Sequence, residues 1–180
     1  MSRSRIRTLI NKNGISEERM DNYLYDFMIL TIFEQLCYKM KDPIVKQDIK
    51  TYFHRTDSYF LTVKEVVIKY TGCDIGDEEA EILFKLLIAH FRKIHIRKSY
   101  PISLKKELLL AQHYSCNICS TNLDVHNSEL DHIIPWDFVG DELENNLQLL
   151  CTTCNERKGR KIDFHLRMLL INSQKNASNF

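Results

Sequence analysis

Two cysteine pairs restrict what this chain can fold into more than any other feature. Cys116 and Cys119 stand in "CNIC", and Cys151 and Cys154 stand in "CTTC". Two residues between paired cysteines allow a tight turn to direct both thiolates at one ion, and four thiolates complete a tetrahedral zinc site. The spacing therefore predicts a structural Zn²⁺, whose coordination leaves no position for a catalytic water.

Other uses of the cysteines remain open at this stage. Two redox pairs are the alternative, although neither pair lies in a clear βαβ setting. A histidine could replace one ligand, and the candidates are His113, His126 and His165. The two remaining cysteines, Cys37 and Cys73, are expected to be small buried residues in helical surroundings.

Composition and charge indicate the cellular setting and the class of partner. The chain is 44% hydrophobic and 27% charged, which is ordinary for a soluble globular protein. Its basic start lacks the apolar region of a secretory signal, so a reducing, cytoplasmic location is expected, and the apolar run at 27–33 is too short to span a membrane. Basic segments at 91–106 and 157–161 suit a polyanion, or are simply solvated helix faces.

The pattern of apolar residues predicts a mainly α-helical chain with a small α+β module. Helices are expected at 17–40, 43–53, 77–97 (capped by Asp77), 103–112 and 155–172, whereas 59–72 could be a strand or a helix. The stretch "KSYP" at 98–101 is the predicted boundary. It separates a helical domain at 1–98 from a second domain at 99–172 and a flexible tail at 173–180.

Motifs around the cysteine pairs resemble a known family of nucleases. "LDHIIPW" lies between the pairs, and "NNLQLLCTTCNERKG" contains the second pair. In this order and spacing they look like the HNH endonucleases, the zinc-containing branch of the ββα-metal nucleases, over roughly residues 100–165. The resemblance implies a β-hairpin followed by a helix, with a catalytic ion held between them.

The resemblance assigns a role to each motif residue. His132 matches the general base that activates water, and Asp131 matches the neighbouring ligand of a divalent ion. Asn146 matches the asparagine that holds the catalytic loop and orients the base. Asn155 matches the final position, which is often asparagine instead of histidine, and would be a second ligand. Oxygen ligands of this kind suit Mg²⁺ or Mn²⁺.

These residues together predict a metal-dependent endonuclease acting on DNA, most simply double-stranded, in restriction or phage defence. The basic side chains expected to contact nucleic acid are Arg97, Lys98, Lys105, Lys158 and Arg160. The alternative is a non-catalytic, zinc-stabilised nucleic-acid-binding module. The helices of residues 1–98 could bind DNA, form a homodimer or dock a regulatory protein, and the sequence does not rank these roles.

Overall fold

The structure, a computed structural model, describes residues 16–55 and 59–162. Residues 32–162 form one compact unit, and a second unit groups residues 1–31 with 163–180, of which only 16–31 are described. The helix α2 (Glu17–Lys39) runs across this division. Among the described helices, none is long and apolar enough to cross a membrane.

Helices α3 (Pro43–Arg55), α4 (Tyr59–Thr71) and α5 (Asp77–Arg92) contact one another in sequence order. The segment at 59–72 is therefore a helix, although its β-branched residues also allowed a strand. Val63, Val66 and Val67 are fully buried. Their spacing covers one side of a helix, whereas a strand would bury alternate residues, so burial outweighs the modest helix propensity of valine.

Helix α5 differs from its predicted form at both ends. It ends at Arg92 instead of residue 97, because the backbone at Lys93 leaves the helical conformation (φ −47°, ψ 121°). The N-cap is Gly76 instead of Asp77, which lies in the first turn and pairs with Lys64 at 2.5 Å. The chain after residue 92 therefore leaves the helix and connects it to the elements that begin at residue 102.

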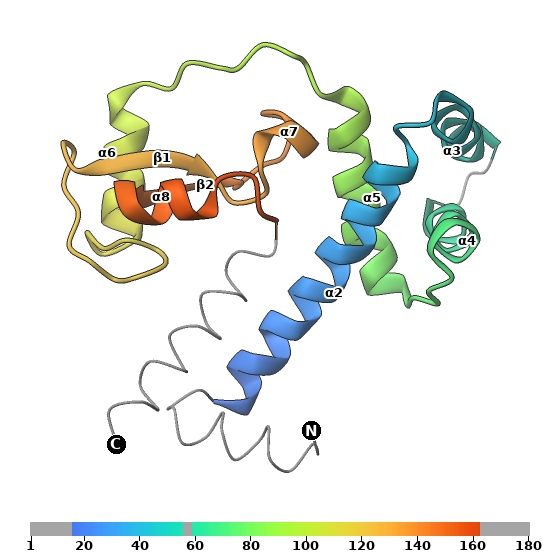
Figure 1. Ribbon diagram of the computed structural model, residues 1–180, viewed down its shortest axis with the longest axis horizontal. Coiled ribbons are helices and arrows are strands. Elements are labelled where there is room, and N and C mark those ends of the chain that lie inside the picture. The colour runs from blue at the N-terminus through green and yellow to red at the C-terminus, as the bar shows by residue number, and fades with distance from the viewer. Residues whose placement is uncertain (1–15, 56–58, 163–180) are drawn as a thin grey trace. The chain divides into compact units, whose positions relative to one another are not determined.

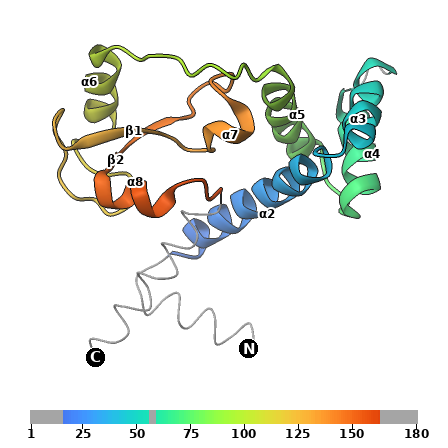
Figure 2. The ribbon, with the colours of Figure 1, turned by 45° about the horizontal axis from the view of Figure 1, so that its top comes forward.

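The second half contains a small antiparallel sheet between helices. Its elements are α6 (Ile102–Ala111), β1 (Ser128–His132), α7 (Trp136–Val139), β2 (Leu147–Cys151) and α8 (Thr152–Lys158). The strands pair in the register Asp131 with Gln148 and His132 with Leu147. Helix α8 lies against one side of the sheet and α6 against the other (Figures 1 and 2).

This arrangement is the strand–strand–helix order that the motifs imply, in a chain that is otherwise mostly helical as predicted. Its core is formed by buried residues from α6, the cysteine turns and β2: Leu109, Cys116, Leu123, Leu149, Leu150 and Cys154. The boundary at residue 98 stays a prediction, and residues on both sides of it belong to the same compact unit.

The last predicted helix has different bounds in the described residues. Helix α8 begins at Thr152 and ends at Lys158, because Gly159 takes a left-handed conformation (φ 51°) that ends an α-helix. Within the described residues, the helix predicted at 155–172 therefore ends at Lys158, and the remainder of that prediction, 163–172, lies outside them. His165 and the predicted tail at 173–180 lie outside the described residues.

Helix α5 contacts the short helix α7, and this contact positions the loop that follows α7. Lys93 Nζ donates to the Asp137 carbonyl at 2.5 Å, and His90 Nδ1 lies 2.7 Å from the Phe138 carbonyl. Gly140 closes the loop with φ 62° and ψ −140°. A Cβ at Gly140 would lie 2.6 Å from Lys93 Cγ, so only glycine fits here without displacement.

We expect Gly140→Ala to destabilise the fold by about 2 kcal/mol or more, because backbone strain and the contact with Lys93 add together. Gly72→Ala is the matched control, since Gly72 also has a positive φ of 72° but nothing within 4 Å of the added Cβ. Urea unfolding of both variants measures the difference. Equal losses would show that α5 does not restrict the loop at residue 140.

Candidate functional site

The four cysteine sulfurs form a compact cluster that fits one tetrahedral ion. The Sγ atoms of Cys116, Cys119, Cys151 and Cys154 all lie within 4.8 Å of one another. Cys119 Sγ is 3.7 Å from Cys151 Sγ. A tetrahedral Zn²⁺ with Zn–S bonds of about 2.3 Å places its sulfurs about 3.8 Å apart. This donor set suggests a structural zinc site, and no histidine of the described residues joins it.

Local backbone turns direct the sulfurs toward a common point. Ser120 donates its amide to the Cys116 carbonyl at 2.9 Å and has a positive φ of 59°, which closes the first turn behind Cys119. Cys151 ends β2 and donates its amide to Cys116 Sγ at 3.4 Å, while Cys154 lies in the first turn of α8. One ion here would hold the first turn, β2 and α8 together.

A chain of side-chain hydrogen bonds runs from the first cysteine turn to Asp131. Asn117 Nδ2 donates to Gln148 Oε1 at 2.8 Å, and Gln148 Nε2 donates to Asp131 Oδ2 at 2.8 Å. Gln148 is buried on the face of β2 that meets α8. Asn117 and Gln148 therefore connect the first cysteine turn by hydrogen bonds to the carboxylate that is predicted to bind a cation.

Lys158 is the second partner of Asp131 and lies beneath it. Its side chain is only 1% exposed, and Nζ is 3.0 Å from Asp131 Oδ2 and 2.6 Å from the His132 carbonyl. The positive charge of the amine balances the carboxylate in a place where water is scarce. Lys158 was expected to contact phosphate, yet its amine is directed into the module; that contact remains a prediction.

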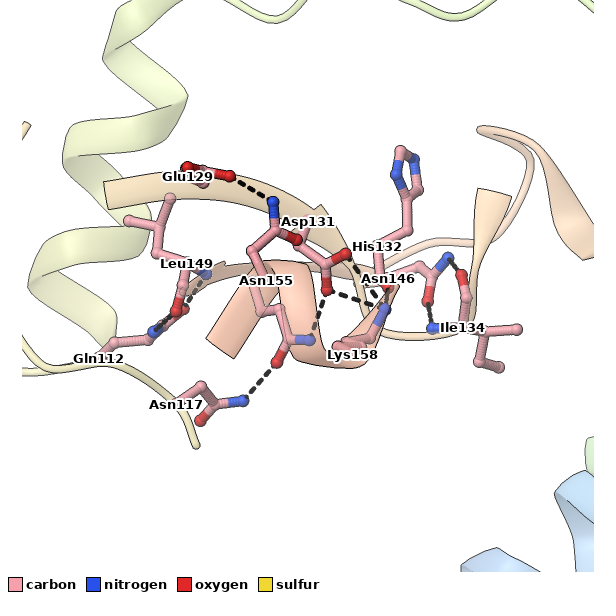
Figure 3. Close-up of polar contacts among 11 residues, drawn as sticks. Gln112, Asn117, Glu129, Asp131, His132, Ile134, Asn146, Leu149, Asn155 and Lys158 are labelled. Carbon is pink, nitrogen blue, oxygen red and sulfur yellow. Dashed lines mark hydrogen bonds and ion pairs between the residues drawn. The ribbon is translucent and has the colours of Figure 1, made fainter. Parts of the chain in front are cut away.

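Asp131 and His132 point in different directions at the end of β1. Figure 3 shows the Asp131 carboxylate directed toward Lys158, whereas the His132 imidazole stands on the other side of the strand. This is the ordinary alternation of a strand. Because β1 ends at His132, both side chains nevertheless line one pocket at the strand end.

The His132 imidazole is bonded to a residue outside the predicted motifs. His132 Nε2 is 2.9 Å from Asp141 Oδ1. Asp141 also accepts hydrogen bonds from Tyr100, Trp136 and the backbone amide of Lys98. Burial alone would raise the pKa of Asp141, but the four hydrogen bonds outweigh it and bring the pKa below the usual range of an aspartate, so the carboxylate is ionised at neutral pH.

Asn146 holds the loop between β1 and α7. Its side-chain oxygen accepts the Ile134 amide at 2.8 Å, its Nδ2 donates to the Ile134 carbonyl at 2.9 Å, and its backbone carbonyl accepts the Ile133 amide at 2.8 Å. Asn146 is buried, so these bonds replace those that water would make. The geometry suits the predicted role of fixing the loop after His132; a part in catalysis stays a prediction.

Asn155 lies on α8 opposite β1. Its Nδ2 donates a short hydrogen bond to Glu129 Oε2. With the nitrogen committed to Glu129, the side-chain oxygen is the atom that could bind a cation. Glu129 and Asp131 lie two residues apart on β1, so both carboxylates face α8.

One open pocket of about 290 Å³ brings most of the predicted site together. Its lining includes Asp131, His132, Trp136 and Asn155, with the guanidinium-bearing residues Arg97 and Arg160. Arg97 lies over the Trp136 ring, 5.1 Å from its centroid, and Arg160 pairs with Asp137 at 2.9 Å. The pocket thus combines an imidazole, carboxylate and amide oxygens and two guanidinium groups.

Two predicted nucleic-acid contacts lie apart from the pocket lining. Lys105 Nζ donates to the Val125 carbonyl at 2.6 Å, and Lys98 Nζ donates to the Asp141 carbonyl at 3.2 Å. Both amines therefore have partners within the module. A contact of either lysine with nucleic acid stays a prediction.

Sequence reasoning missed Asp141, Gln148 and Glu129. Asp141 follows a glycine in a turn, a pattern that marks turns in general and carries no indication of a histidine partner. Gln148 is the one polar residue among the leucines of β2, and this was the sign in the sequence that it could have a polar partner. Glu129 lies two residues before Asp131, and strand alternation alone could have placed both on one face.

We expect Cys154→Ser to lose the bound zinc and to unfold the module around β2, because the ligand is buried in the core. Metal analysis should find about one Zn²⁺ per wild-type chain and much less in the variant. The single tryptophan, Trp136, should report the loss as fluorescence of an exposed indole. Cys73→Ser is the control. Cys73 lies outside the cluster, so this variant should keep the zinc.

We expect Lys158→Met to destabilise the chain by about 3 kcal/mol, because Asp131 then remains partly buried without its cation. Thermal unfolding measures the loss. Lys161→Met is the control, because among the described residues that amine bonds the Arg157 carbonyl alone, at the exposed end of α8. If both variants unfold at the same temperature, the pair with Asp131 does not contribute to stability.

Comparison with known proteins identifies part of the chain. Residues 116–171 match the model of the HNH endonuclease family. The match contains both cysteine pairs and all four motif residues, and it confirms the resemblance seen in the sequence. No curated protein and no solved structure matches the chain. At the level of the family, this supports nuclease activity and binding to nucleic acid.

Proposed function

We propose that this HNH endonuclease domain hydrolyses phosphodiester bonds of double-stranded DNA with the help of a divalent ion. The observation that carries the proposal is the pocket at the end of β1, where His132, Asp131 and Asn155 meet two arginines. Phosphodiester hydrolysis needs a base for water, compensation for charge on phosphate, and a fixed geometry. Residues suited to each task line the same pocket.

His132 is the proposed general base. An imidazole that is neutral near pH 7 can accept a proton from water as the water attacks phosphorus. In the leaving step the departing oxygen gains negative charge, and the guanidinium groups of Arg97 and Arg160 lie in the lining where they can bind the phosphate oxygens.

Asp131 and the side-chain oxygen of Asn155 are the proposed ligands of Mg²⁺ or Mn²⁺. Carboxylate and amide oxygens suit these hard ions, and Glu129 orients the amide so that its oxygen is presented. A bound ion would supply charge compensation at the phosphate. The Lys158 amine, which balances Asp131 in this structure, would then share the carboxylate.

A non-catalytic nucleic-acid-binding module is the second candidate. The observation that favours it is the Asp131–Lys158 pair, because a neutralised carboxylate needs no metal ion. The arginines and the zinc site would then serve binding alone. For either function we propose a defence or restriction role, in which the N-terminal helices form a homodimer or dock a regulatory protein.

Plasmid cleavage separates the two candidates. With Mg²⁺ or Mn²⁺, wild-type protein should nick or cut DNA, and His132→Ala should lower the rate by about 10²- to 10⁴-fold, the usual contribution of a general base. His126→Ala is the matched control, because this histidine lies exposed in a turn of the same domain. Zinc content and unfolding temperature should stay at wild-type values in both variants.

Absence of cleavage with either ion, combined with salt-dependent DNA binding, would support the non-catalytic module. Cleavage that survives His132→Ala would exclude His132 as the base. An RNA substrate cut faster than the plasmid would correct the substrate and leave the base assignment intact.

A further inference from the structure

The side chain of Asp141 is buried and forms more hydrogen bonds than a turn aspartate needs. Its side chain is 3% exposed, and its Oδ1 lies 2.9 Å from His132 Nε2 and accepts the Tyr100 hydroxyl at 2.6 Å. Its Oδ2 accepts Trp136 Nε1 at 2.9 Å and the Lys98 amide at 3.0 Å. Two donors on each oxygen prevent the carboxylate from rotating.

The ionisation state of Asp141 determines which nitrogen of His132 carries the proton. An ionised carboxylate has only acceptor atoms, so the nitrogen that faces it must be the donor. When the imidazole is neutral, Nε2 therefore holds its hydrogen, and Nδ1 keeps the lone pair that can accept a proton from water. The bond to Asp141 also restrains rotation of the ring.

We propose that Asp141 is the positioning residue for His132, and that the segment 98–100 is part of its support. The proposal rests on the proposed function, in which His132 is the base. Asp141 itself does not touch substrate. It holds the ring with Nδ1 available for water, and it stabilises the imidazolium that forms when the proton arrives.

Part of the support of Asp141 comes from the segment between α5 and α6. Two of the four donors, Lys98 and Tyr100, precede α6 and follow α5, so they lie at the junction between the N-terminal helices and the nuclease domain. Burial, and then the bond to Asp141, raise the pKa of Tyr100 to about 12, so its hydroxyl remains a donor at neutral pH. The junction thereby contributes to the geometry of the base.

Kinetics of Asp141→Asn test the role on DNA. We expect kcat to fall about 10- to 100-fold, in the range seen when a partner that orients a functional histidine is lost, while KM changes little. Asp124→Asn is the matched control: that carboxylate also accepts two amides in a turn, from His126 and Asn127, and does not face His132. Tyr100→Phe should give a smaller loss than Asp141→Asn.

A double-mutant cycle shows whether Asp141 acts through His132. Adding Asp141→Asn to His132→Ala should lower the residual rate no further, because the group that Asp141 positions is gone. Equal proportional losses in both backgrounds, or a loss confined to unfolding temperature, would overturn the proposal and leave Asp141 a structural tie between the junction and α7.

Nuclear magnetic resonance of the wild-type chain tests the same point without activity. Long-range ¹H–¹⁵N spectra at about pH 8, above the ordinary histidine pKa, should show the His132 proton on Nε2, with the signal assigned by its absence in His132→Ala. A proton on Nδ1 would overturn the proposal. If wild-type protein cuts no DNA, the proposed function fails, and this spectrum still decides whether Asp141 sets the tautomer.

Discussion

The cluster of four cysteines is the interaction on which the rest of the strand–strand–helix module depends. It joins three short pieces of chain: the turn at 116–119, the end of β2 and the start of α8. From this cluster the relay through Asn117 and Gln148 leads to Asp131. A structural ion bound by these cysteines would therefore also fix the strand that carries the Asp131 carboxylate.

The end of β1 resolves the conflict between strand geometry and a shared site. Neighbouring residues of a strand face opposite sides, and Asp131 and His132 obey that rule. Asp131 turns to α8, where Lys158 and Asn155 lie, and His132 turns to Asp141. Since the strand stops at His132, the two groups border the same pocket from different sides. A longer strand would have separated them.

The junction after α5 adds a constraint that crosses the predicted boundary at residue 98. Lys93 bonds the Asp137 carbonyl in α7, and Gly140 fits closely against the Lys93 side chain. Lys98 and Tyr100 donate hydrogen bonds to Asp141. The contacts of Lys93 and Lys98 would be lost if the chain were divided after residue 98, whereas the bond of Tyr100 to Asp141 lies within the second part. These contacts connect the N-terminal helices to Asp141 and through it to the His132 imidazole.

The sequence by itself predicted a four-cysteine zinc site, because ligand chemistry and short spacings are local properties, and its resemblance to the HNH family implied the strand–strand–helix order. It also placed most helices, through the periodicity of residues such as Leu83 and Leu87, but not the end of α5 or the break at Gly159. Only the tertiary structure decided that Lys158 neutralises Asp131 and that Asp141 holds His132. These pairs join residues far apart in the chain, or across a loop whose course depends on α5, and no local pattern encodes such proximity.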